Sequence, residues 1–236
     1  MSCRWPQRTS HRAAAITVLS AAVVGFTTVQ WLGRTSGASR GERRRRMPGD
    51  ETIPDPSMVT THAATIDAPP SAVWPWLIQM GWHQGGWYTE RWVDRLLFPA
   101  NEAAADHLIP ELQQRVVGDF IPDGPPESGC GFRIEVADVD RALVLRSTSH
   151  LPAAWRTRFS AELDWTWSFQ LDDLGNRRTR LAFRTRCVAR PWWVLIAYKA
   201  ALIPADFVMS RQMLRGITRR AEHLAAEQAA RRAARS

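Results

Sequence analysis

The chain has 236 residues, 45% of them hydrophobic and 12 of them Trp, and a formal net charge of +8. This is enough apolar material for one medium-sized domain with extensions. The positive charge lies at the ends, since residues 1–12 carry +3, residues 34–46 carry +5 and residues 211–236 carry +5, which leaves −5 for the rest. A mildly acidic middle has the wrong sign for a folded nucleic-acid surface, so we expect no nucleic-acid partner, whereas Arg-rich ends suit an anionic membrane face.

The three cysteines are far apart in the sequence and include no C-x-x-C pair. A disulfide framework is therefore not expected, which fits a reducing compartment. The histidines show no metal-ligand spacing, and neither Cys130 nor Cys187 has a histidine at ligand distance in the sequence. We therefore expect neither a metal site nor a cofactor.

Residues 13–33 form an uncharged stretch, and a helix of that length reaches roughly 30 Å, about one hydrocarbon core. Three interpretations stay open: a membrane anchor, which we favour, a cleaved signal peptide, and a soluble helix. The larger Arg cluster follows this stretch, and the positive-inside rule keeps such a cluster in the cytoplasm. The sequence thus predicts a single-pass membrane protein with a cytoplasmic C-terminal domain, although the Ser-Gly-Ala before Ser39 would serve as a cleavage site for export.

The remaining organisation follows from composition. Residues 34–56 are dominated by Gly, Ser, Arg and Pro and have no apolar period, so they are expected to be an Arg-rich linker. The N-terminal segment with the membrane anchor then covers residues 1–33. The folded domain is expected over residues 57–228, and a basic tail over residues 229–236.

The folded domain is expected to begin with a strand that stops at Pro69 and Pro70, because Pro70 has its φ set for the first turn of a helix. Val73, Leu77 and Met80 then recur at helical spacing. A further proline inside this helix predicts that it is short or bent.

A second short helix is expected over residues 89–98. Glu90 and Asp94 lie four residues apart there, and paired carboxylates can divide acid and base roles. Arg91 and Arg95 alternate with them, which favours an ordinary solvated helix face.

The second half of the domain shows the period-2 alternation of antiparallel strands with one dry face. The apolar positions are Trp165, Trp167, Phe169 and Leu171 on one strand, and Leu181, Phe183, Thr185 and Cys187 on the next. The arginines between the second set are expected on a solvated face. After Pro191 the spacing changes to three and four residues, which predicts a long amphipathic helix that closes on the aromatic face of the sheet.

Five segments carry a resemblance to a known family. They are TIDAPPSAVWPWLIQMG (65–81), GGWYTERW (85–92), VGDFIP (117–122), RALVLR (141–146) and MSRQMLRGITRRAE (209–222). They resemble an uncharacterised bacterial branch of the START/Bet v 1-like superfamily, also labelled SRPBCC or polyketide cyclase/dehydrase-like, over roughly residues 57–225.

The resemblance implies an α+β helix-grip fold, in which a curved antiparallel sheet of about six or seven strands surrounds a long C-terminal helix and leaves an apolar cavity. In this chain a transmembrane-like helix precedes that fold. Members of the superfamily bind lipids, sterols, polyketides or plant hormones, and a minority catalyse aromatic cyclisation or dehydration. The fold alone does not choose among these activities.

The cavity wall is expected to come from the glycine-aromatic loop and the aromatic strand, since ligand pockets are mainly apolar. The predicted ligand-binding residues are Trp82, His83, Trp87, Tyr88, Trp92, Trp165 and Trp167. Plain core packing is the alternative for each tryptophan. His83, Glu90 and Asp119 are weak catalytic candidates, and Asp119 is more simply explained as a turn cap.

The sequence therefore predicts a membrane-tethered domain that binds a hydrophobic small molecule or lipid in an internal cavity, without chemistry of its own. Residues 13–33 would anchor the chain in the membrane. The alternative is a cyclase or dehydratase acting on a polyketide-like substrate. Two or more convergent titratable groups in the pocket would favour the enzyme, and a purely aromatic and aliphatic lining would favour the binder.

Overall fold

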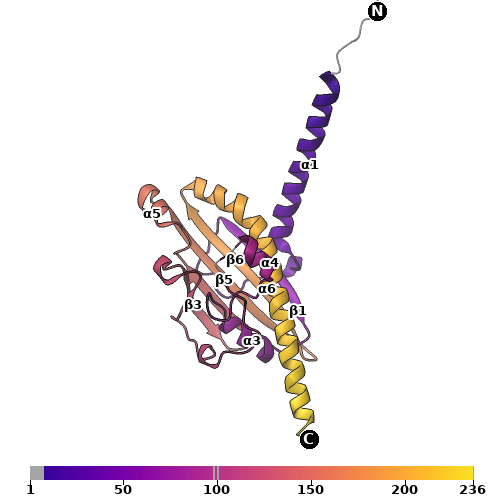
Figure 1. Cartoon of the computed structure of the whole chain (residues 1–236), viewed down its shortest axis with the longest axis vertical. Helices are drawn as coiled ribbons and strands as arrows, with labels where there is room; N and C mark the ends of the chain where they lie inside the picture. The colour runs from indigo at the N-terminus through magenta and orange to yellow at the C-terminus, as the bar shows by residue number, and fades with distance from the viewer. Residues whose placement is uncertain (1–7, 98, 100, 236) are drawn as a thin grey trace, which may run out of the picture.

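A long helix crosses a curved sheet in this structure, a computed structural model that describes residues 8–97, 99 and 101–235 (Figure 1). The α-helices are α1 (Arg8–Thr35), α2 (Arg40–Arg44), α3 (Pro70–Ile78), α4 (Arg91–Leu97), α5 (Ala153–Phe159) and α6 (Trp192–Ala233). The strands are β1 (Met58–Ile66), β2 (Phe120–Pro122), β3 (Gly131–Asp138), β4 (Ala142–Ser147), β5 (Glu162–Gly175) and β6 (Arg178–Arg190), and two short 3₁₀ turns are η1 (Pro110–Leu112) and η2 (Pro126–Ser128).

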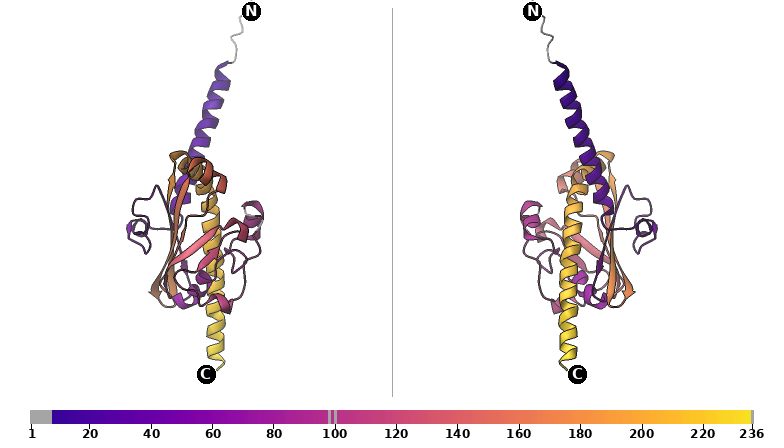
Figure 2. Two further views of the ribbon diagram at one scale, coloured as in Figure 1. Left: turned by 90° about the vertical axis from the view of Figure 1, so that its left-hand side faces the viewer. Right: turned by 90° about the vertical axis from the view of Figure 1, so that its right-hand side faces the viewer.

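The described strands form one sheet in the order β1-β6-β5-β4-β3-β2, with every neighbouring pair antiparallel. The long α6 runs along one face of this sheet, and α3 and α4 lie on the same side (Figures 1 and 2). This is the predicted helix-grip arrangement. The α+β fold class is confirmed, and so is the resemblance to START/Bet v 1-like proteins at the level of fold.

The inner face of the sheet is apolar because the alternation continues in register across neighbouring strands. Trp167 pairs with Thr185, and Phe169 pairs with Phe183, so the side chains of β5 and β6 stack in rows. On α6, residues such as Ile217 and Ala221 are fully buried against these rows. The alternation of the strands and the helical spacing of α6 therefore describe the two sides of one core.

The outer face of the sheet is covered by residues 36–56, which we call the outer strap. The guanidinium of Arg184, only 2% exposed, anchors this segment to β6. It donates to the carbonyl oxygens of Glu42 (2.8 Å), Arg43 (3.2 Å) and Arg45 (3.0 Å), and to the carboxylate of Asp50 (2.7 Å). The expectation of a solvated face is wrong for Arg184, because the strap excludes water from it.

Further polar contacts fasten the outer strap along its length. Arg180 donates a hydrogen bond to the carboxylate of Glu42 at 2.7 Å. This hydrogen bond lowers the pKa of Glu42 to about 2, although burial of the carboxylate acts in the opposite direction and raises it. Ser168 donates to the carbonyl of Pro48 at 2.6 Å, and Arg186 donates to the carbonyl of Ile53 at 2.9 Å. The segment predicted to be a linker is thus packed against the sheet. Met47 and Ile53 are buried as isolated apolar side chains, and the other contacts named here are polar, so the sequence shows no apolar period.

The N-terminal helix α1 projects from the body, and its last turn packs against α6 (Figure 2). Within the described residues it contains one candidate membrane span, Ile16–Thr35, with a mean hydropathy of 1.5 and 8% of it buried. Val18 and Val24 are more than half exposed. A Cβ added to Gly33 would lie 2.8 Å from Cγ2 of Ile203, so glycine allows α1 and α6 to approach closely at this point.

Replacing Arg184 tests the outer strap. We expect Arg184→Lys to lower the free energy of unfolding by about 2 to 3 kcal/mol, because an ammonium group cannot reach the carbonyls and the carboxylate that the planar guanidinium bridges. Arg178→Lys on the same strand is the matched control, since Arg178 is 52% exposed, and should change the free energy by less than about 0.5 kcal/mol. Urea denaturation measures both variants, and equal small losses would contradict the proposed role of Arg184.

Candidate ligand-binding site

The enclosed space between the sheet and α6 is nearly filled by aromatic side chains. The remaining cavity has a volume of about 40 Å³, close to the volume that one water molecule occupies in the liquid. Its walls include Trp165, Trp167, Thr185, Cys187, Asp206 and Met209. This cavity, formed by the described residues, is too small for the lipid-sized guest that the sequence predicts for an internal cavity.

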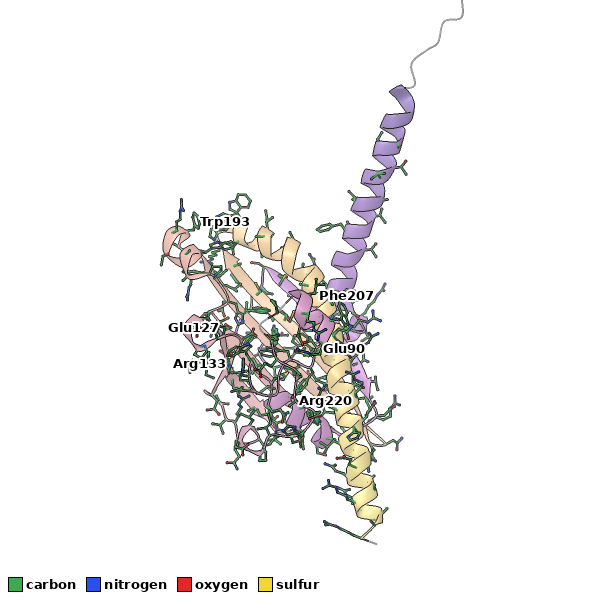
Figure 3. The ribbon with its side chains drawn as sticks, in the orientation of Figure 1. Glu90, Glu127, Arg133, Trp193, Phe207 and Arg220 are labelled. Atoms are coloured by element: carbon green, nitrogen blue, oxygen red, sulfur yellow. The ribbon has the colours of Figure 1, made fainter. Side chains whose placement is uncertain are left out.

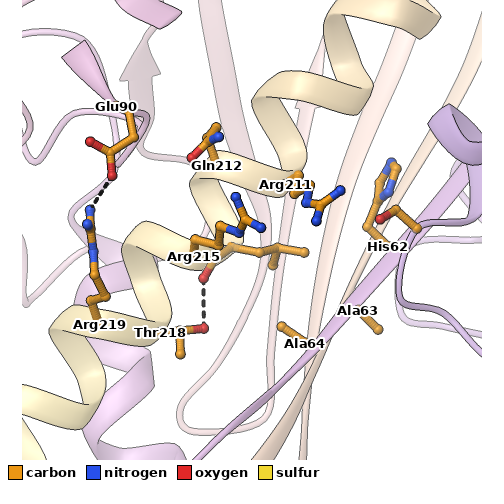
Figure 4. Close-up of a pocket in the computed structure, with 11 residues that line it drawn as sticks. His62, Ala63, Ala64, Glu90, Arg211, Gln212, Arg215, Thr218 and Arg219 are labelled. Carbon is orange, nitrogen blue, oxygen red and sulfur yellow. Dashed lines mark hydrogen bonds and ion pairs between the residues drawn. The ribbon is translucent and has the colours of Figure 1, made fainter. Parts of the chain in front are cut away.

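A larger hollow lies beside this interior, as an open groove of about 590 Å³ between the edge of β1 and α6. Ala63 and Ala64 of β1 form one side of it, and Leu214 of α6 contributes to the other (Figure 4). Ser36, at the start of the outer strap, also lines the groove, and its carbonyl accepts a hydrogen bond from the Ala63 N–H at 3.2 Å. Its volume lies in the range of small-molecule sites.

Three arginines of α6 line this groove at four-residue spacing, so they project from one face of the helix. Arg219 is paired with Glu90 at 2.8 Å. Arg211 stacks on Phe207, with its guanidinium carbon 6.0 Å from the ring centroid. Within the described part of the chain, neither Arg211 nor Arg215 has a carboxylate partner, and Figure 4 shows both extending toward β1. The groove therefore presents uncompensated positive charge beside an apolar floor.

His62 and Asp206 separate the groove from the inner cavity. His62 on β1 is 1% exposed and lines the groove, while Asp206 on α6 lines the inner cavity. Nε2 of His62 lies 3.2 Å from Oδ2 of Asp206, and Ser210 donates to the other carboxylate oxygen at 2.9 Å. The arrangement brings two titratable groups together at the boundary between the two hollows.

Several polar atoms on the inner face of the sheet have no hydrogen-bond partner within the described residues. They are Nδ1 of His62, the hydroxyls of Thr60 and Thr185, and the indole nitrogens of Trp165 and Trp167. Buried polar groups are nearly always paired in folded proteins. This concentration of free donors and acceptors indicates a place where water or a polar group of a ligand completes the hydrogen bonding.

The predicted wall residues lie in several places rather than in one wall. Trp165 and Trp167 line the small inner cavity, and Trp87 packs edge-on against Trp167 with ring centroids 5.3 Å apart. Tyr88 is buried and donates to the carbonyl of Trp76 at 2.8 Å. Desolvation raises the pKa of Tyr88 above its ordinary value, and it serves the core.

The other predicted residues lie nearer the surface. Trp82 and His83 lie in a shallow surface pocket, where His83 contacts Glu102 at 3.3 Å. Trp92 on α4 is 55% exposed. Asp119 accepts a hydrogen bond from the N–H of Val116 at 2.9 Å, which is the turn-capping role favoured for it. Of the three weak catalytic candidates, only Glu90 lines the groove.

Sequence reasoning missed His62, Asp206, Arg211 and Arg215. His62 could have been placed on the inner face, since it continues the period-2 pattern of Met58 and Thr60. Asp206 carries no comparable signal, because only the packing of α6 across β1 brings it to the histidine. The two arginines were counted with the basic C-terminal end, where nothing marked them as facing a groove.

Ser147, His150 and Asp123 form a second cluster, which resembles the nucleophile, base and carboxylate of a catalytic site but has a structural role. Nδ1 of His150 lies 2.6 Å from Oγ of Ser147, and its Nε2 lies 2.8 Å from Asp123. Burial alone would lower the pKa of His150, but Asp123 and then Cys130 outweigh it and raise the pKa to about 9. A general base has to be neutral, whereas this imidazole is protonated at neutral pH and ties the loop at Asp123 to the end of β4.

Within the residues described, no group of three or more His, Cys, Asp or Glu side chains is placed to hold a metal ion. The thiol of Cys187 lies beside the inner cavity, and its burial raises its pKa to about 12. It is therefore a neutral, weakly reactive thiol near pH 7.

The raised pKa of His150 predicts a pH dependence of stability. A group whose pKa is higher in the folded state stabilises the fold fully below its unfolded pKa near 6.5 and loses that contribution as pH rises through the folded pKa of about 9. We expect the free energy of unfolding to fall between pH 6.5 and 9 by on the order of 2 kcal/mol. Urea denaturation across this range measures it, and His150→Gln should flatten the profile. A profile that stays equally steep in His150→Gln would show that another group titrates.

Comparisons with known proteins place the chain by fold only. No family model matches the sequence, and no curated protein matches it. Similar solved structures include a hypothetical protein from Helicobacter pylori, with 13% identity and a TM-score of 0.46 over 74% of this chain and 94% of that chain. Another is the Zhui aromatase/cyclase from Streptomyces, with 16% identity and a TM-score of 0.38 over 70% of this chain and 93% of that chain. A third is a point mutant of norcoclaurine synthase from Thalictrum, with 13% identity and a TM-score of 0.34 over 67% of this chain and 94% of that chain. These likenesses carry no argument about activity, and the fold assignment rests on the strand order and α6.

Proposed function

We propose that the chain binds an anionic amphiphile, such as a fatty acid, in the groove between β1 and α6. The observation that carries this proposal is the pair of arginines without carboxylate partners, Arg211 and Arg215, beside the apolar residues Ala64 and Leu214. A carboxylate or phosphate would pair with the guanidinium groups in the bidentate geometry that arginine favours. The hydrocarbon chain would lie along the apolar floor of the groove. The ligand class is the predicted one, but the site moves from the interior to the edge of the sheet.

We further propose that α1 tethers this domain to a membrane as a single span, with the domain on the cytoplasmic side. The length and hydropathy of Ile16–Thr35 support a span, and its described aliphatic side chains, such as Val18 and Val24, are more than half exposed. The Arg-rich residues that follow support the cytoplasmic side by the positive-inside rule. A ligand drawn from the membrane would then meet a groove that is lined in part by Ser36, directly after α1.

Charge reversal on α6 tests the groove. We expect laurate to bind residues 34–236 at least about tenfold more tightly than dodecanol does, because only the acid pairs with the arginines. The double variant Arg211→Glu and Arg215→Glu should remove that preference. Isothermal titration calorimetry measures both ligands.

Arg231→Glu with Arg232→Glu is the matched control, since these residues lie on the same helix near its C-terminal end and do not line the groove. This control should leave the preference for laurate unchanged. Equal affinities of laurate and dodecanol for the unaltered chain would refute the proposed role of the arginines.

One observation favours the second candidate function, an enzyme such as a cyclase or dehydratase. His62 and Asp206 converge between the groove and the inner cavity, and Nδ1 of His62 has no partner within the described residues. A histidine oriented by a carboxylate is a common arrangement for proton transfer. His62 lines the groove and Asp206 lines the inner cavity, so the two titratable groups converge without sharing one pocket, and the enzyme stays the second candidate. The sequence placed candidate acids and bases elsewhere.

Conservative variants distinguish the two candidate functions. If His62 moves protons, His62→Gln and Asp206→Asn should abolish conversion of polyketide-like thioesters, followed by mass spectrometry, while laurate affinity changes less than about threefold. If the chain only binds, no conversion occurs in either the unaltered chain or the variants. Arg219→Gln, which also lines the groove, serves as the control for a general disturbance of the site.

A further inference from the structure

The first turns of α6 are apolar on every side. From Trp192 to Ile203 the sequence contains one charged residue, Lys199. Val194 and Ile203 point into the body and are fully buried, but Trp192 is 71% exposed and Ile196 is 56% exposed one turn later. A helix that is apolar all round is normally covered by protein or by lipid, and among the described residues of this segment Trp192, Ile196 and Ala200 are exposed.

The neighbouring α5 extends this apolar surface and adds positive charge. Phe159 is 47% exposed and packs edge-on against Trp193 of α6, with ring centroids 5.4 Å apart. The guanidinium of Arg158 lies 5.5 Å from the centroid of the Phe159 ring, and Arg156 on the same helix is exposed. We call the residues Trp192, Ile196, Phe159, Arg156 and Arg158 the aromatic end surface.

The aromatic end surface lies at the end of the body from which α1 projects. Figure 1 shows α5 and the start of α6 on that side, with the C-terminus at the opposite end, and Figure 3 shows Trp193 on that side. The close approach of Gly33 to Ile203 fixes this relation, because it fastens the last turn of α1 to α6 directly after the exposed apolar turns. The aromatic end surface therefore lies at the same end of the body as the candidate membrane span.

We infer that the aromatic end surface inserts into the headgroup layer of the membrane that α1 spans, so that the domain meets the bilayer at two places. Trp and Phe side chains suit this layer, and Trp can keep its N–H in contact with water. Arg156 and Arg158 pair with anionic lipid headgroups. Each arginine increases the affinity of the domain for the membrane surface by at most about tenfold. This inference rests on the proposed tether and adds a defined orientation to it.

Quenching by brominated lipids tests the inference on the full chain in vesicles of phosphatidylcholine and phosphatidylglycerol. Bromines on the upper acyl chain quench tryptophans that reach the headgroup layer. Trp192→Phe should remove part of the quenched fluorescence, whereas Trp92→Phe, also an exposed tryptophan but on α4, should remove none of it. Thermal denaturation confirms that both variants remain folded.

The arginines provide an independent arm of the same experiment. Arg156→Glu with Arg158→Glu should abolish the part of the quenching that depends on Trp192, and Arg231→Glu with Arg232→Glu, at the opposite end of the body, should leave it intact. If the chain sediments with the vesicles but Trp192→Phe behaves like Trp92→Phe, the tether stands and the inserted surface is refuted. A chain that does not enter the vesicles at all refutes both.

Discussion

The buried guanidinium of Arg184 is the constraint on which the outer half of the molecule depends. A cation withdrawn from water is tolerated only when its N–H groups are paired, and here Asp50 and three strap carbonyls supply the partners. Because the outer strap leads from α1 directly to β1, the same pairing fixes where α1 leaves the body. The residues just before the strap include Gly33, which contacts Ile203, and the first residue of the strap, Ser36, lines the groove.

The inner face obeys a different constraint, that of close packing. Large aromatic side chains such as Phe169 and Phe183 stack at 4.6 Å between centroids and occupy the space that a helix-grip fold often leaves for a guest. A groove of ligand size lies at the edge of β1, where α6 contributes Arg211, Arg215 and Arg219 to its lining. His62 and Asp206 mark the boundary between the filled interior and that edge. The same face of the fold thus combines a rigid core with an accessible charged groove.

The fold could be predicted because each element of the core repeats its pattern, as Trp167 and Phe169 do on β5 and Ile217 does on α6. The outer strap could not, because it is held mainly through its own backbone carbonyls, which any residue supplies, and its composition is that of a free linker. The groove was missed for a related reason. Arg215 reads as one more charge on a solvated helix, and only the crossing of α6 over β1 makes it part of a site.

The packed outer strap also determines how far the domain can travel. If residues 36–56 were a flexible linker, their two ends would be separated by roughly 25 Å on average, and the domain could move relative to α1. Contacts such as those of Arg180 and Ser168 hold this segment along the sheet, so it does not act as a flexible linker. If α1 spans a membrane as proposed, a domain mounted in this way would stay close to that bilayer. Ligand exchange in the proposed groove would then be limited to molecules that diffuse laterally near α1.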